Sequence, residues 1–146
     1  MLNQQLIKGV FLSPLKQIFH PQGDVFHAMK SSDDGFAGFG ETYFSTITKG
    51  EIKAWKKHTE MTLNLVVPVG KIRFVAYDDR QDSETKGVFN EFVLSLENYA
   101  RLTVPPHVWL AFQGLDEKNL LLNIANIEHN PNEIERKNLE EIIFCW

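Results

Sequence analysis

Two side chains near the middle of the chain have the chemistry of a proton-transfer site. Lys56 and His58 fall in the predicted strand 52–58. An imidazole titrates at about pH 6.5, so His58 could act as a general base without special tuning. Lys56 could stabilise a developing negative charge, or act as the base itself if burial and the neighbouring Lys53 and Lys57 lower its pKa. The alternatives are a structural histidine and lysines that solvate an exposed strand.

A second polar group precedes this strand. Glu41, Tyr43 and Ser45 alternate along the predicted strand 38–48, and a period of two places them on one face of a sheet. Tyr43 could supply a phenol as a proton donor, although an aromatic side chain in a strand often serves packing alone.

Other polar residues interrupt apolar strands. Asn64 sits between Leu63 and Leu65, and Asn123 lies in the predicted strand 120–126 with His129 shortly after it. A polar group inserted into a core strand is costly unless it is paired, so we expect at least some of these to line a cavity or cap its mouth. The alternatives are a bulge or strand-edge position for Asn64 and a plain loop position for His129.

The elements that must position these residues are short strands. Apolar and polar residues alternate with a period of two, and Gly, Pro, Asn and Asp interrupt them about every ten residues. This pattern favours a closed antiparallel double sheet over a parallel sheet with helical crossovers. A helical pattern is predicted only at 131–142. The strands are predicted at 9–11, 25–29, 38–48, 52–58, 61–67, 70–78, 89–94, 101–104, 109–114 and 120–126.

The composition of the chain narrows its class. With 146 residues, one domain spanning 1–146 is expected, and a net charge of -4 gives no electrostatic footprint for nucleic acid. The single cysteine, Cys145, cannot form an intrachain disulfide, which favours a reducing cytoplasm. No apolar stretch approaches the roughly 18 residues of a membrane helix, so no membrane partner is expected.

The spacing around His58 matches the first cupin motif. In that pattern a Gly, a His-x-His pair, a Glu and a second Gly follow one another at fixed intervals. Here Gly50 and Gly70 take the glycine positions and His58 the second His, while Lys56 and Leu63 replace the first His and the Glu. A divalent ion needs several converging donors, and most of these positions offer none. We therefore predict a cupin without a metal.

A second cupin motif follows later in the chain. Its pattern is a Pro-x-Gly with a His three residues after the Gly, and 105–110 has the same spacing. His107 stands at the Gly position and Leu110 at the His position. The second motif therefore also lacks its usual metal ligand.

The chain resembles RmlC-like cupins, the dTDP-4-dehydrorhamnose 3,5-epimerases and the related sugar ketoisomerases. Matching segments occur in the same order at 15–26, 39–45, 75–80, 83–87 and 102–112. The resemblance implies an all-β, double-stranded β-helix (jelly roll), here with the short C-terminal helix. It also implies a cofactor-independent epimerase or isomerase of bacterial polysaccharide precursor biosynthesis. The implied partners are a nucleotide-linked 4-keto sugar and a second copy of the chain in a homodimer.

The resemblance also assigns roles to residues. Lys56 stands where the epimerases have their base and Lys53 where they have an Arg, while His58 matches the second His of the ketoisomerases. His129 coincides with family tyrosines, and a diphosphate would be held by Lys53 and Arg73. We predict catalysis by His58, Lys56 and Tyr43. Substrate binding is predicted for Glu41, Ser45, Lys53, Asn64, Arg73, Asn123 and His129.

Two other functions are compatible with the sequence. One is a non-catalytic cupin that binds a sugar or sugar nucleotide as a partner subunit, because the usual epimerase base and acid are replaced. The other is a metal-dependent cupin oxygenase or isomerase, which the ligand count disfavours.

Overall fold

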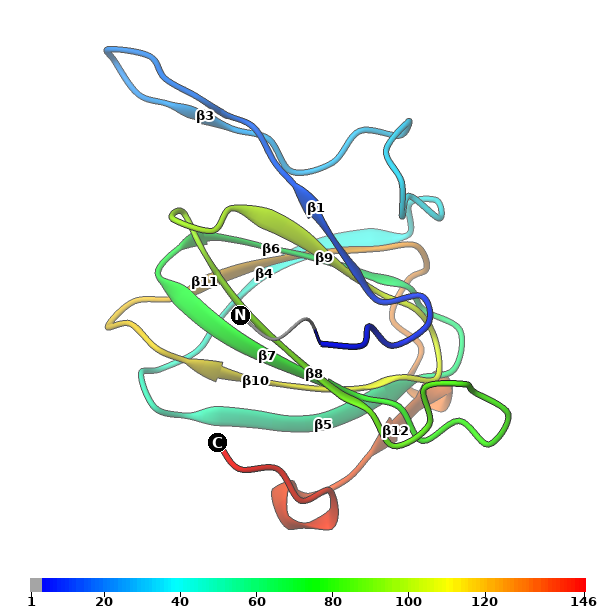
Figure 1. The fold of residues 1–146 in the computed structure, drawn as a ribbon. Helices are drawn as coiled ribbons and strands as arrows, with labels where there is room; N and C mark the ends of the chain where they lie inside the picture. Colours follow the sequence, from blue (N-terminus) through cyan, green and yellow to red (C-terminus); the bar gives the residue numbers. More distant parts are fainter. Residues whose placement is uncertain (1–3) are drawn as a thin grey trace.

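Two antiparallel five-stranded sheets form the body of the protein in the computed structural model, which describes residues 4–146 (Figure 1). One sheet has the strand order β1-β9-β6-β11-β4 and the other β12-β5-β10-β7-β8, while β2 and β3 form a separate ribbon. The strands are β1 (Phe11–Pro14), β2 (Gln17–Ile18), β3 (Val25–Phe26), β4 (Glu41–Thr46), β5 (Ile52–His58), β6 (Leu63–Val69), β7 (Lys71–Tyr77), β8 (Phe89–Ser95), β9 (Ala100–Val104), β10 (Trp109–Gly114), β11 (Leu120–Ala125) and β12 (Ile134–Arg136).

Successive strands from β4 to β12 alternate between the two sheets, except at the β7–β8 hairpin. This winding is that of a jelly roll, so the predicted all-β double-stranded β-helix is confirmed. The main hydrophobic core lies between the sheets and includes Leu65, Ile72, Phe74, Leu94 and Leu102. Some residues of this core also line the cavity described below.

The predicted strands correspond closely to the observed ones. Strands β5 and β10 have the bounds predicted from the sequence. The first strand was predicted too early, because Gly9 has a φ of 89° and Val10 N–H donates to the Ile7 carbonyl in a turn. Strands β2 and β12 were not predicted, since two or three residues carry too little periodicity to stand out.

The predicted C-terminal helix is wrong. Residues 131–142 form two 3₁₀ turns, η1 (Pro131–Glu133) and η2 (Leu139–Glu141), with β12 between them. Ile134 and Arg136 pair with His58 and Lys56 along the edge of β5, which satisfies backbone groups that a helix would have satisfied internally. Tertiary pairing therefore overrides the local helical pattern.

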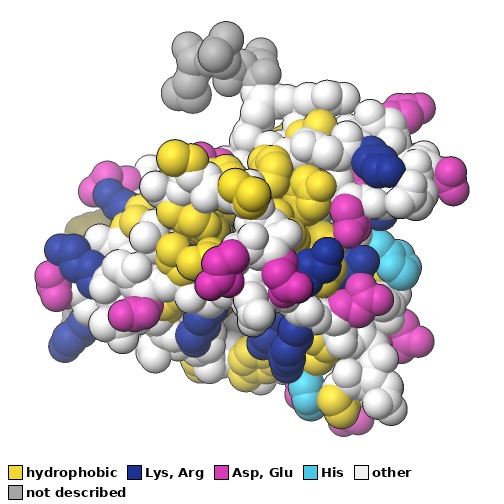
Figure 2. All heavy atoms as spheres, turned by 90° about the horizontal axis from the view of Figure 1, so that it is seen from below, with side chains coloured by type: hydrophobic (Ala, Val, Ile, Leu, Met, Phe, Trp, Pro, Cys, Tyr) yellow, Lys and Arg dark blue, Asp and Glu magenta, His cyan; other side chains and the backbone are white. Residues whose placement is uncertain are grey.

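A second hydrophobic cluster covers the outer face of the β5-β10-β7-β8 sheet. Trp55, Val75 and Trp109 point away from the main core, and Ile142 packs against them, with Trp146 nearby. The C-terminal segment thus lies below β5 (Figure 1). In the view from below, hydrophobic side chains gather in one area with charged side chains around it (Figure 2). Trp55 is 0% exposed and Trp109 is 1% exposed, so both tryptophans are buried in this cluster.

Candidate active site

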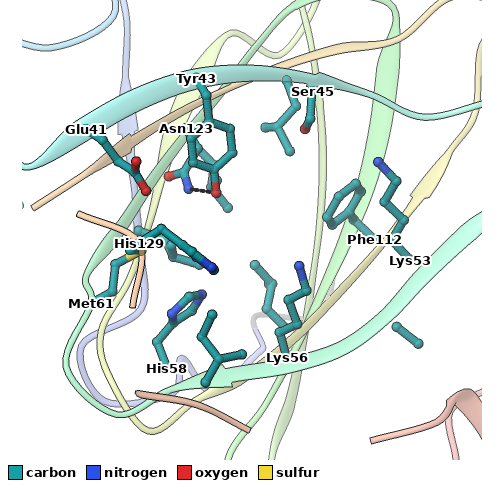
Figure 3. A pocket seen from close by; sticks show the side chains of 16 residues that line it. Glu41, Tyr43, Ser45, Lys53, Lys56, His58, Met61, Phe112, Asn123 and His129 are labelled. Atoms are coloured by element: carbon teal, nitrogen blue, oxygen red, sulfur yellow. Dashed lines mark hydrogen bonds between the residues drawn. The ribbon is translucent and has the colours of Figure 1, made fainter. Parts of the chain in front are cut away.

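A cavity opens between the two sheets (Figure 3). Strand β4 forms one wall and β5 the opposite wall, and apolar side chains from β6 and β10 form its floor. Sixteen residues line it: Glu41, Tyr43, Ser45, Lys53, Ala54, Lys56, His58, Met61, Leu63, Leu65, Leu110, Phe112, Leu121, Asn123, His129 and Ile134. The walls are polar and the floor is apolar, which is typical of a small-molecule site.

His58 reaches the cavity from the end of β5 with one ring nitrogen already bound. Its Nδ1 lies 2.5 Å from Glu133 Oε1, and its side chain is 12% exposed. In Figure 3 the ring points from the β5 wall toward the middle of the cavity. A carboxylate on Nδ1 fixes the proton there, so Nε2 keeps its lone pair for the cavity.

Glu133 is a buried carboxylate that serves this histidine. The residue is 3% exposed, and its Oε2 accepts hydrogen bonds from the backbone N–H groups of Thr59, Glu60 and Met61. Burial alone would raise the pKa of Glu133, but the hydrogen bond to His58 and those from the backbone outweigh it and hold the pKa below its ordinary value. The carboxylate is therefore charged and fixed in place beside the imidazole.

Lys56 lies on the same wall as His58, two residues earlier. Partial burial is the largest cause that lowers the pKa of Lys56, and the positive charges of Arg136 and Lys53 lower it further. Arg136 is paired with Lys56 in the β12–β5 register, so its side chain starts from the same side of the sheet. Two lysines thus line this part of the cavity, and the charge of Arg136 is close enough to act on Lys56.

Lys53 is held at the cavity rim. Its Nζ donates to the Thr46 carbonyl over 2.7 Å and lies 5.8 Å from the centre of the Phe112 ring. Both Lys53 and Lys56 line the cavity because a register shift between Leu110 and Phe112 breaks the alternation of β5 against β10. Strict alternation would have turned one lysine outward.

Tyr43 faces His58 from the opposite wall. It extends from β4 into the cavity, and its hydroxyl accepts a hydrogen bond from Asn123 Nδ2 on β11 over 2.8 Å (Figure 3). Glu41 and Ser45 line the same wall, as the period-2 pattern predicted, and His129 lies beside Glu41 at the mouth. The structure therefore brings eight of the ten predicted site residues to one cavity.

Asn64 and Arg73 do not line the cavity, and this part of the prediction is corrected. Asn64 faces the other side of its sheet, where it donates to the Gly35 carbonyl and accepts from Thr103. Arg73 also faces outward, with its Nε 2.5 Å from Glu91 Oε1. In both cases the alternation along the strand determines which face of the sheet the side chain occupies. The residues on either side face inward, so Asn64 and Arg73 face outward; these neighbours are Leu63, Leu65, Ile72 and Phe74.

Sequence reasoning missed Glu133 and Arg136. Both lie in the segment predicted as a helix, and the chain has 19 acidic residues, so composition could not single out one carboxylate. The usable signal was indirect, because a histidine on a cavity wall needs a partner to fix its tautomer. Within residues 4–146 no group of three or more His, Cys, Asp or Glu side chains is arranged to hold a metal ion.

Comparison with known proteins places this site in a family. No family model matches the chain. A crystallised dTDP sugar isomerase from Desulfovibrio desulfuricans G20 is 38% identical, with a TM-score of 0.92 over 96% of this chain and 92% of that one. The chain belongs to the RmlC-like family of sugar-nucleotide epimerases and isomerases. An RmlC epimerase from Legionella pneumophila, 18% identical with a TM-score of 0.82 over 93% of this chain and 76% of that one, shares the fold.

Two curated relatives are also similar in sequence. A probable low-salt glycan biosynthesis epimerase of Haloferax volcanii is 36% identical over 84 residues, which are 56% of this chain and 54% of that protein. The match thus spans about half the length of that relative. The spore coat polysaccharide biosynthesis protein SpsL of Bacillus subtilis is 26% identical over 97% of both chains.

In residues 4–146 no helix is long and apolar enough to cross a membrane.

Proposed function

We propose that the protein is a cofactor-independent epimerase or isomerase of a nucleotide-linked 4-keto sugar, acting in the synthesis of polysaccharide precursors. The names of the Desulfovibrio, Haloferax and Bacillus relatives support the substrate class and the pathway. The observation that carries the proposal is the His58–Glu133 pair on one wall of the cavity with Tyr43 on the other.

His58 is the proposed base. A hydrogen on the carbon next to a ketone is acidic enough to be removed when the resulting enolate is stabilised. With Nδ1–H donated to Glu133, Nε2 accepts this proton, and the carboxylate stabilises the imidazolium that forms. The C–H electron pair moves into the enolate and the ketone oxygen becomes negative.

Lys56 is the proposed stabiliser of that oxygen. Its ammonium lies on the wall that carries His58, and the depressed pKa brings it closer to proton transfer with an enolate. Charge stabilisation of this kind needs no metal or organic cofactor, since a positioned cation in a partly desolvated site supplies it.

Tyr43 is the proposed acid. Because it stands on the wall opposite His58, a proton delivered from its hydroxyl reaches the face of the enolate that the base did not use. Removal from one face and delivery to the other inverts the carbon, which is an epimerisation. Return of a proton to a different carbon of the enediol would give the ketoisomerase outcome.

The end of the cavity that carries the lysines is the proposed nucleotide end. Lys53 lines the cavity there, Arg136 pairs with Lys56 along the edge of β5, and both carry charges that suit a diphosphate. Glu41, Ser45 and His129 remain for the sugar hydroxyls at the other wall. Arg73, engaged with Glu91 on the outer face, is not part of this proposal.

We also propose one domain over residues 1–146, of which 1–3 lie outside the described residues, and a homodimer in the cytoplasm. The β2–β3 ribbon extends away from the sheets (Figure 1) and exposes Phe19 by 79%, Val25 by 53% and Ile18 by 46%. Apolar side chains exposed side by side mark an interaction surface, and a second copy of the chain would cover them. Sedimentation equilibrium measures the mass that decides this point.

Solvent exchange tests the proposed chemistry. Nucleotide-linked 4-keto sugars incubated with the protein in D₂O should gain deuterium next to the ketone. His58→Ala should lower this incorporation on the order of 10²- to 10⁴-fold while the sugar nucleotide still binds. Lys56→Ala should also slow it, whereas Lys49→Ala, which changes an exposed lysine paired with Glu117, should not. Tight binding without any incorporation would contradict the proposal and indicate a non-catalytic sugar-nucleotide-binding cupin.

A further inference from the structure

Asn123 holds the hydroxyl of Tyr43 from the neighbouring strand. The two residues are direct Cα partners in the β4–β11 register, and Asn123 Nδ2 donates to Tyr43 Oη over 2.8 Å. Figure 3 shows the two side chains lying together on the same wall. Thr42 fixes the strand at this point, because its hydroxyl donates to the Asn123 carbonyl over 2.9 Å. The contact is therefore built into the register of the sheet.

The hydrogen bond to Tyr43 comes at a stability cost. Asn123 is 4% exposed, and its Oδ1 has no hydrogen-bond partner among the described residues. A buried amide oxygen without a partner loses its hydrogen bonds to water and gains none in the folded protein, so it lowers stability. The residues two positions away on the same strand, Leu121 and Ala125, are apolar and buried, so an apolar side chain at 123 would fit this face without that cost. The amide is thus explained by its contact with Tyr43.

The direction of this hydrogen bond decides where the phenol proton points. A tyrosine hydroxyl has one proton to donate and two lone pairs to accept. The Asn123 N–H group occupies one lone pair, which leaves the hydroxyl proton free to point into the cavity. The same N–H group supports the negative charge that the oxygen acquires when the proton leaves.

We propose that Asn123 is a positioning residue that keeps Tyr43 in its proton-donating orientation and so sets how often deprotonation ends in inversion. This rests on the proposed function. His58 takes the proton from the carbon, and the C–H pair forms the enolate. The enolate carbon then takes the Tyr43 proton on its other face as the ketone re-forms. Imidazolium and phenolate remain and are reset by proton exchange with solvent.

A double-mutant cycle with Tyr43→Phe tests the proposal. Asn123→Asp replaces the N–H donor by an acceptor, which would turn the phenol proton away from the cavity. It should lower the rate of inversion on the order of 10²-fold, whereas wash-in of deuterium by His58 should fall less than about 3-fold. In the Tyr43→Phe background the same substitution should change inversion by less than about 2-fold, because its effect passes through Tyr43. Asn123→Ala serves as a second variant if the buried carboxylate disturbs folding.

A control variant and an independent measurement separate a failure of the positioning role of Asn123 from a failure of the proposed function. Asn98→Asp makes the same change on an exposed turn and should leave both rates unchanged. In protein that contains tyrosine labelled with ¹³C at Cζ, NMR gives one resonance for Tyr43, which its loss in Tyr43→Phe identifies. The chemical shift of this resonance should change in Asn123→Asp, whether or not the protein is an epimerase. An unchanged chemical shift would overturn the positioning role. Equal losses of wash-in and inversion, or equal losses in both backgrounds, would also overturn it, whereas a wild type without wash-in contradicts the proposed function alone.

Discussion

Glu133 and Asp78 are both buried carboxylates with a depressed pKa, yet their surroundings differ. The partners of Asp78, which is 0% exposed, are Arg80, Ser83 and Thr85, and none of these lines the cavity. Glu133 divides its oxygens between backbone N–H groups and one imidazole that faces the cavity. Asp78, whose partners lie away from the cavity, stabilises the fold, whereas Glu133 orients the ring of a histidine that lines the cavity.

Substitution of Glu133 should have the largest effect, and this effect is on the rate of deuterium wash-in. In Glu133→Gln the backbone N–H groups of Thr59, Glu60 and Met61 should select the amide oxygen, which turns the amide NH₂ toward His58 Nδ1. Nδ1 must then accept, the ring proton moves to Nε2, and the base loses its lone pair toward the cavity. We expect deuterium wash-in to fall on the order of 10³-fold with little change in substrate affinity.

Glu60→Gln is the matched control for this prediction. It makes the same change two positions from His58, on an exposed side chain that does not line the cavity. Its wash-in rate should equal that of the wild type. If Glu133→Gln kept the wild-type rate while remaining folded by circular dichroism, Glu133 would be a structural carboxylate like Asp78.

Substitution of Asp78 should have the next largest effect, and this effect is on the stability of the fold. In Asp78→Asn one acceptor oxygen is lost beside Arg80, Ser83 and Thr85, which leaves buried donors unpaired and the Arg80 charge uncompensated. We expect the free energy of unfolding to fall by about 3 kcal/mol, measured by urea denaturation. The wash-in rate per folded molecule should stay unchanged. A large loss of rate without loss of stability would reverse the roles assigned to the two carboxylates.

The same variant should change the response to acid. Burial alone would raise the pKa of Asp78, but the hydrogen bonds from Arg80, Ser83 and Thr85 outweigh it and leave the pKa well below its ordinary value. The unfolded chain therefore binds this proton more readily than the folded one. The stability that Asp78 contributes is complete above the unfolded pKa of about 3.9 and is lost as the pH falls toward the folded pKa. The slope of unfolding free energy between pH 5 and 3, with about 1.4 kcal/mol per pH unit per proton, should be smaller in Asp78→Asn.

The sequence predicts the strands and most residues of the cavity walls, but it does not predict Glu133, the carboxylate that bonds His58. Alternation alone placed Glu41, Tyr43 and Ser45 on one wall, and the cupin glycine spacing placed Lys56 and His58 on the other. Glu133 could not be predicted, since it reaches His58 from 75 positions away through a segment whose local pattern is helical. Asn64 and Arg73 were misplaced because a polar residue in an apolar strand can face either side, and only the flanking residues show which.

The smallest expected effect concerns two turns, one next to Asp78 and one next to His58, the partner of Glu133. Next to Asp78 the left-handed position is Gly87, with a φ of 87°, whose N–H donates to the Asp78 carbonyl over 2.7 Å. Next to the cavity it is His107, with a φ of 70°, whose N–H donates to the His58 carbonyl over 2.6 Å. A side chain in this region is strained, and a β-branched one most of all. His107→Val should therefore be less stable than His107→Gly by about 1–2 kcal/mol in urea denaturation, while His107→Gly stays within about 0.5 kcal/mol of the wild type, because glycine relieves strain but adds freedom to the unfolded chain. Equal stabilities of the two variants would mean that the turn beside His58 relaxes freely and does not hold the end of β5 in place.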